Sequence, residues 1–134
     1  TYYEGDRYTT EQHRETLKVN GWTFCPVDIM DKDGTAMLPV KNGKWFTEMS
    51  VGRNLLNYES LLVLTHFKGH VMGGFGGSNK NIGIGCADGR IGKAMIHTVE
   101  GSDNMWSIAE EELMERITES TKSVVLASIS HLSM

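Results

Sequence analysis

The sequence predicts an α/β fold in which helices flank a mixed sheet with a buried central strand and a β-meander. Three observations lead to this prediction. The chain opens with a helix capping pattern, and β-prone runs separated by Asp-Gly and Asn-Gly pairs follow it. Residues 60–65 are apolar without alternation, which is typical of a strand buried on both faces. The chain has 134 residues, 40% of them hydrophobic, so we expect one domain over residues 1–134.

The first elements follow from local signals. Thr9 followed by Gln12 forms a capping-box pattern, and Asn20-Gly21 favours a left-handed stop, so we expect a helix over residues 9–20. Pairs favoured in hairpin turns, Asp33-Gly34 and Asn42-Gly43, separate the β-prone runs that come next. These runs are expected to form the meander: Trp22 to Met30, Thr35 to Lys41 and Lys44 to Val51.

The C-terminal third predicts a long acidic helix. Residues 107–121 place four apolar side chains at helical spacing, and glutamates 110–112 favour the positive end of the helix dipole. For Val124 to Ile129, β-branching favours a strand and the lack of Gly or Pro favours a helix, so both stay open and we favour helix. If the chain forms a homo-oligomer, this apolar end should supply the interface through Val124, Val125, Leu126 and Ile129.

Composition excludes several classes of protein. Thirteen Lys plus Arg against seventeen Asp plus Glu give a net charge of -4, which argues against a general nucleic-acid binder. The apolar runs are far shorter than the roughly 20 residues of a membrane span. Two cysteines, Cys25 and Cys86, cannot supply the four thiolates of an ordinary iron-sulfur cluster, so we expect no such cluster in this chain. The low count suits a cytoplasmic protein with free thiols.

One segment combines basic residues with glycine. Residues 66–99 carry four bases and one acid, and nine of the fifteen glycines lie between Gly69 and Gly92. The predicted buried strand runs into this segment, which should open a helix near Ser78. Ligands bind at the carboxyl ends of strands in open α/β sheets, and the free amides of a glycine turn and a helix start favour anions. We therefore predict a concave ligand-binding loop over residues 65–81.

The candidate residues of the loop are those with side chains or backbone amides suited to an anion. They are His66, Lys68, His70, Gly76, Gly77, Lys80 and Asn81. The lysines suit a carboxylate or a phosphate, although ordinary solvated lysines are an equal alternative. The two histidines are four residues apart, so a helical or tightly turned path would aim both imidazoles at one divalent metal. The alternatives are hydrogen bonds to the loop backbone, acid-base work and substrate contact. No catalytic residue is assigned.

The same residues resemble a known family. Thr65-His66-Phe67-Lys68-Gly69-His70, Gly73-Gly74-Phe75-Gly76-Gly77 and Lys80 to Ala87 are similar to the core block of the domain family of unknown function 362. Flanking segments resemble the family in their usual order: Tyr2 to Gly5, Thr9 to Glu11, Val27 to Asp31 and Gly92 to His97.

The resemblance implies a longer parent protein. Family members are often described as iron-sulfur centre proteins, and many carry a cysteine cluster in a carboxyl-terminal segment or append ferredoxin-like modules. The resemblance therefore implies that this chain is an internal portion and that a cluster, where present, lies outside it.

The expected function combines both lines of reasoning. We expect a cytoplasmic protein that binds a small anionic ligand or a divalent metal through the loop, linked to redox chemistry through an iron-sulfur cluster outside this chain. The alternative is an interaction or scaffold domain, without catalysis of its own, for a ferredoxin-like domain or protein. An exposed apolar surface would favour the second hypothesis, and a pocket with converging polar groups would favour the first.

Overall fold

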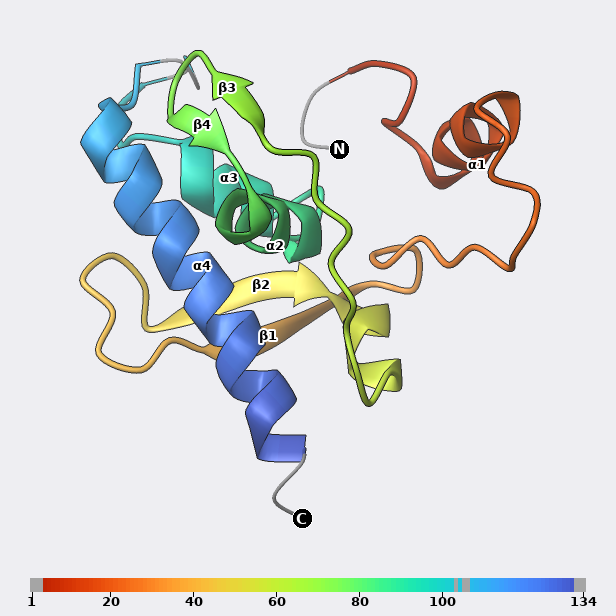
Figure 1. Cartoon of the computed structure of the whole chain (residues 1–134). Coiled ribbons are helices and arrows are strands. Elements are labelled where there is room, and N and C mark those ends of the chain that lie inside the picture. Colours follow the sequence, from red (N-terminus) through yellow and green to blue (C-terminus); the bar gives the residue numbers. More distant parts are fainter. Residues whose placement is uncertain (1–3, 103, 105–106, 132–134) are drawn as a thin grey trace.

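The structure is a computed structural model that describes residues 4–102, 104 and 107–131, with side chains up to residue 128 (Figure 1). It is a mixed α/β fold of four α-helices and two small antiparallel sheets within these residues. In this part of the chain, every helix is too short or too polar to cross a bilayer.

The N-terminal helix forms as predicted. Helix α1 spans Thr10–Val19, and Thr9 is its N-cap: the Thr9 hydroxyl accepts from the Gln12 amide while the Gln12 side chain accepts from the Thr9 amide. The helix ends at Asn20, and Gly21 follows with a φ of +82°. No residue of α1 is buried, and Figure 1 shows the helix standing apart from the rest of the molecule.

The meander is reduced to a hairpin. Strands β1 (Thr35–Pro39) and β2 (Glu48–Gly52) pair antiparallel, with Met37 opposite Ser50. The predicted first strand, residues 22–30, is irregular. It contains Pro26, which has no amide proton for a ladder. The predicted three-stranded meander is therefore wrong in its first strand.

The connection between β1 and β2 is longer than the two-residue turn expected at Asn42-Gly43. Asn42 does adopt a left-handed φ of +54°. However, the Glu119 carboxylate accepts hydrogen bonds from the backbone amides of Lys44, Trp45 and Phe46, at 2.6 to 3.2 Å. This carboxylate holds the loop against the C-terminal helix, so strand pairing stops at Pro39 and Glu48.

The predicted buried central strand at residues 60–65 is wrong, and so is the mixed sheet built on it. Residues 60–67 are irregular, and both sheets have two antiparallel strands. Leu62 and Leu64 are 83% and 77% exposed. A strand buried on both faces needs paired edges and covered faces. Here neither edge is paired, and the apolar run lies at the surface.

The remaining helices form the body of the fold. Strands β3 (Lys68–His70) and β4 (Gly74–Gly76) make a small hairpin that leads directly into α2 (Ser78–Cys86), close to the predicted helix start. Helix α3 (Gly92–His97) was not predicted. Helix α4 (Glu110–His131) joins the predicted acidic helix and the segment 124–129 into 22 residues, which confirms the helical interpretation.

The core lies where α4 crosses the β1–β2 hairpin and packs along α2 (Figure 1). Met49 and Val51 of β2 and Ile117 of α4 are fully buried there. Val124 is 1% exposed and belongs to this core, so the prediction that it contributes to an interface is wrong for that residue. Val125 is exposed, and the side chain of Ile129 lies outside the described residues. Both cysteines are free thiols, as predicted.

Candidate functional site

The β3–β4 hairpin brings two lysines together around a glycine. Lys68 of β3 is the register partner of Gly76 in β4, and Lys80 lies in the first turn of α2. A Cβ atom on Gly76 would lie 3.9 Å from Lys68 Cγ and 3.8 Å from Lys80 Cδ. The two lysine stems therefore flank Gly76, although twelve residues separate them in the sequence.

Gly77 places the start of α2 beside these lysines. It is the N-cap of α2, and no side chain caps the helix there. The first amides of the helix have no intrahelical partner, which makes this end attractive to an anion. The Phe67 and Phe75 rings lie next to Gly77, since a Cβ there would be 3.7 Å from Phe67 Cδ2 and 3.8 Å from Phe75 Cε2. The ring centroids are 5.4 Å apart.

The electrostatics of this cluster are cationic. Burial lowers the pKa of Lys80, and the neighbouring Lys68 lowers it further. In the described part of the chain, neither lysine makes an ion pair with a carboxylate. An anion placed between the two ammonium groups would relieve their mutual repulsion.

His70 completes the cluster as a hydrogen-bond donor. Burial lowers its pKa, and Lys80 and Lys68 lower it further, which favours the neutral imidazole at pH 7. The backbone amide of Met72 donates to His70 Nδ1 at 3.2 Å. The neutral ring therefore carries its proton on Nε2, which can donate to an anion but cannot bind a metal in that tautomer.

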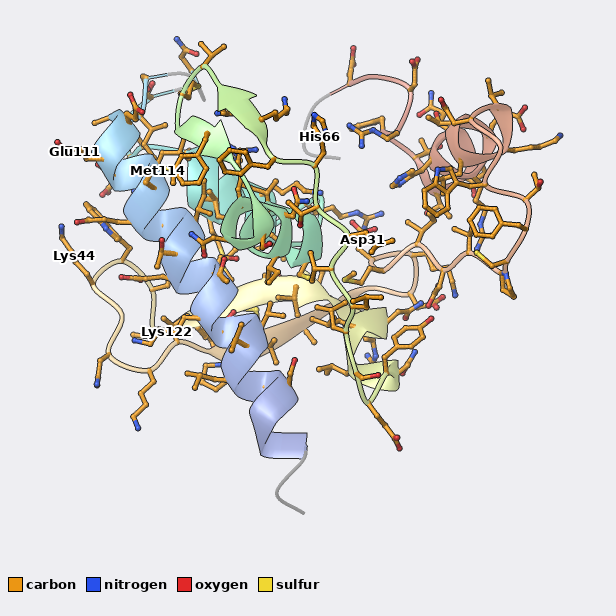
Figure 2. The ribbon with its side chains drawn as sticks, viewed as in Figure 1. Asp31, Lys44, His66, Glu111, Met114 and Lys122 are labelled. Carbon is orange, nitrogen blue, oxygen red and sulfur yellow. The ribbon has the colours of Figure 1, made fainter. Side chains whose placement is uncertain are left out.

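His66 and Asn81 lie apart from this cluster. Figure 2 shows His66 on the irregular segment before β3, on the side of the molecule that faces the N-terminal arm. The chain is extended from Lys68 to His70, so the helical path that would aim His66 and His70 at one metal is absent. Asn81 donates its side-chain amide to the Thr65 hydroxyl at 3.2 Å, which ties the irregular segment to α2.

The cluster is an open surface. Lys68 is exposed, and four cavities of the described part of the chain are lined by other residues. Among the described side chains there is also no group of three or more His, Cys, Asp or Glu placed to hold a metal. The structure therefore places the Lys68 and Lys80 side chains beside Gly76, and His70 lies in the same strand as Lys68.

This block is also the part of the sequence that carried the family resemblance. Residues 2–133 match the family model described as domain of unknown function (DUF362). The chain belongs to the DUF362 family. Searches of curated proteins and of solved structures gave no match. In this DUF362 chain, the family block runs from the irregular segment at Thr65 through the β3–β4 hairpin to the end of α2.

One residue of the cluster was missed by the sequence analysis. His97, at the end of α3, lies close enough to Lys80 for that charge to lower its pKa, although burial is the larger cause. Its Nδ1 donates to the Lys93 carbonyl at 2.8 Å in the tautomer that this contact requires. The only sequence signal was that Gly92 to His97 looks like a DUF362 segment. The basic cluster of this chain is thus Lys68, His70, Lys80 and His97.

Proposed function

We propose that this DUF362 chain binds a small anion, a carboxylate or a phosphate, at the basic cluster and the first turn of α2. The observation that carries the proposal is the placement of the Lys68 and Lys80 side chains together beside Gly76, without an ion pair to a carboxylate in the described part of the chain. Two lysines held together without a counter-ion favour an anion from solution.

The surroundings support the same ligand class. The open N-terminus of α2 adds backbone donors, and His70 adds an Nε2 donor. Gly76 leaves room between the lysine stems that any larger residue would fill. The Glu110 carboxylate raises the pKa of His70, but burial, Lys80 and Lys68 each lower it by more. The cluster therefore keeps an excess of positive charge.

Inorganic phosphate titrated into the protein at low salt tests the proposal. We expect saturable changes in the amide resonances of Gly76, Gly77 and Lys80. Lys68→Gln and Lys80→Gln should each weaken binding by about tenfold, since a charge-assisted hydrogen bond is worth about 1.4 kcal/mol or more. Lys18→Gln, on the exposed face of α1, is the matched control and should leave the affinity unchanged. Equal affinity in all variants would contradict an anion site here.

A second candidate function is docking of a protein partner. The segment 61–75 exposes five apolar side chains to more than half of their area: Leu62, Leu64, Phe67, Val71 and Phe75. Their exposed fractions run from 56% to 99%, and exposed apolar residues gathered in this way mark interaction surfaces. Following the family resemblance, the partner that we propose is a ferredoxin-like domain or protein.

Binding of a fluorescently labelled ferredoxin, followed by anisotropy, tests this candidate. The double variant Leu62→Ser with Leu64→Ser should lose binding by about tenfold or more while keeping phosphate affinity, because each buried leucine contributes about 1.5–3 kcal/mol to an apolar contact. Val19→Ser, which removes an exposed valine from α1, should change nothing. Absence of ferredoxin binding by the native protein would reject the partner, and unchanged binding by the double variant would reject the surface.

Other expectations stay predictions. They are a cytoplasmic location, a divalent metal at His66 and His70, homo-oligomerisation, and the absence of an iron-sulfur cluster from this chain. Anaerobic reconstitution with iron and sulfide tests the last of these. The isolated chain should show no stoichiometric iron-thiolate absorption band.

A further inference from the structure

A cavity with a volume of about 240 Å³ lies beside the C-terminal part of α4, remote from the basic cluster. Its walls come from the segment before β1, from residues 55–61 and from α4 between Val124 and Ser128. Figure 1 shows the short 3₁₀ helix Arg53–Asn57 on this side of the fold, with the β3–β4 hairpin at the other end of the molecule. Pockets for drug-sized ligands measure about 300–1,000 Å³, so this cavity suits a smaller molecule.

Most side chains of the lining are apolar. Val124 is 1% exposed, whereas Leu56 and Leu61 are each 43% exposed, so the lining extends from the core to the molecular surface. An apolar chain that enters from solvent would bury its methylene groups against these side chains, which favours binding. The apolar residues of the lining are Met30, Leu55, Leu56, Leu61, Val124 and Ala127.

The charged side chains of the lining are both carboxylates. They are Asp28 and Glu59, and the lining contains no lysine, arginine or histidine. Glu59 makes no ion pair or side-chain hydrogen bond within the described residues.

The cations outside the lining do not neutralise these carboxylates. Lys32 is shared, since its Nζ lies 3.4 Å from Asp28 Oδ1 and 2.5 Å from Asp33 Oδ2. Arg53 acts on Asp33 as well. Three carboxylates, those of Asp28, Asp33 and Glu59, therefore stand against two cations, which leaves one negative charge in excess.

Hydrogen bonds hold the Asp28 carboxylate at the wall of the cavity. Asn54 donates to both of its oxygens, at 3.0 and 3.1 Å, and the Tyr58 hydroxyl donates to Oδ2 at 3.0 Å. The hydrogen bond from Asn54 is the largest effect on the pKa of Asp28 and lowers it, so this carboxylate is ionised at pH 7. The negative charge is thus fixed beside the apolar lining.

We propose that this cavity is a binding site for a small amphipathic cation, an alkylammonium, with its ammonium group at Glu59 and Asp28 and its alkyl chain against Leu55, Leu61 and Val124. The site is separate from the basic cluster and takes a ligand of the opposite charge. Its test is therefore independent of phosphate binding there.

Calorimetric titration with octylammonium tests the proposal. We expect a dissociation constant of about 1 mM for a ligand of this size. Octanoate has the same apolar chain and the opposite charge, and it should bind at least about tenfold more weakly. Butylammonium has the same charge and half the chain, and it should also bind at least about tenfold more weakly, because it buries fewer methylene groups.

Variants separate the two carboxylates from the rest of the chain. Glu59→Gln should weaken octylammonium binding by about threefold, as expected for an exposed carboxylate. Asp28→Asn combined with Glu59→Gln should abolish the preference for octylammonium over octanoate. Glu15→Gln, on the exposed face of α1, and Lys80→Gln, in the basic cluster, should leave the affinity unchanged.

Nuclear Overhauser effects locate the chain in the native protein without any substitution. We expect contacts from the octyl chain to the methyl groups of Leu55, Leu61 and Val124. Equal affinity for octanoate in the native protein, an unchanged affinity in Glu59→Gln, loss of binding in Lys80→Gln, or octyl contacts outside this lining would each overturn the proposal.

Discussion

Replacing Asp88 with alanine should lower the free energy of unfolding by about 4 kcal/mol, because a buried carboxylate would be removed from four donors. Asp88 is 1% exposed. Its Oδ1 accepts from the amides of Arg90 and Ile91 at 2.9 Å, and its Oδ2 accepts from the Gly92 amide at 2.9 Å and the Ser50 hydroxyl at 2.5 Å.

These bonds join two parts of the molecule. Asp88 closes the turn between α2 and α3 and attaches it to Ser50 in the centre of β2. Asp88→Ala leaves three backbone amides and a buried hydroxyl unsatisfied, and urea denaturation followed by circular dichroism measures the loss. Glu15→Ala, which removes an exposed carboxylate from α1, is the control and should change stability by well under about 1 kcal/mol. Equal stability of the two variants would contradict the role of Asp88.

The same residue should make stability depend on acid pH. Burial alone would raise the pKa of Asp88, but the hydrogen bonds from Ile91, Ser50, Gly92 and Arg90 together lower it. A carboxylate with a lowered folded-state pKa stabilises the protein above its unfolded pKa of about 4, and this contribution is lost as pH falls through the folded pKa. The stability difference between the native protein and Asp88→Ala should therefore shrink below about pH 4.

The sequence correctly predicted those helices whose formation depends on residues close together in the chain. The capping box of Thr9 and Gln12 is complete within four residues, and α1 forms as expected. The glutamates 110–112 begin α4 where the sequence placed them. Helix α3 depends instead on the Asp88 carboxylate and, through it, on Ser50 of β2. Ser50 and Asp88 are 38 positions apart, and a contact over this distance produces no periodic pattern in the sequence from which α3 could be predicted.

Burial was the property that the sequence predicted least well. An apolar run such as residues 60–65 is compatible with a buried strand and with a surface that awaits a partner, and only the surrounding structure distinguishes them. The candidate site shows the same limit. Lys68 and Lys80 were selected from the composition of the segment, but their proximity in space depends on the pairing of Lys68 with Gly76 in the β3–β4 hairpin. His66 and His70 were paired on the assumption of a helical path, and the hairpin replaces that path with an extended one.

Two glycines of α2 should respond in opposite directions to the same substitution. Gly83 faces α4, where an added Cβ would lie 2.6 Å from the Ile117 carbonyl oxygen and 2.8 Å from Thr121 Oγ1. A backbone atom cannot rotate away, so the two helices must separate. Gly85 lies two residues further along the same helix, and a Cβ atom added there would have no neighbouring heavy atom within 4 Å.

Gly83→Ala should therefore destabilise the protein by about 2 kcal/mol, since overpacking costs about 1–3 kcal/mol and exceeds the gain in helix propensity. Gly85→Ala should stabilise the protein by about 0.5–1 kcal/mol, because alanine reduces the conformational entropy of the unfolded chain and its methyl group would contact no other residue. Thermal unfolding of both variants measures the two signs. A stabilised Gly83→Ala would mean that α2 and α4 are not packed this closely. Because α2 also carries Lys80, the separation of the helices in Gly83→Ala should weaken phosphate binding at the basic cluster, whereas Gly85→Ala should leave it intact.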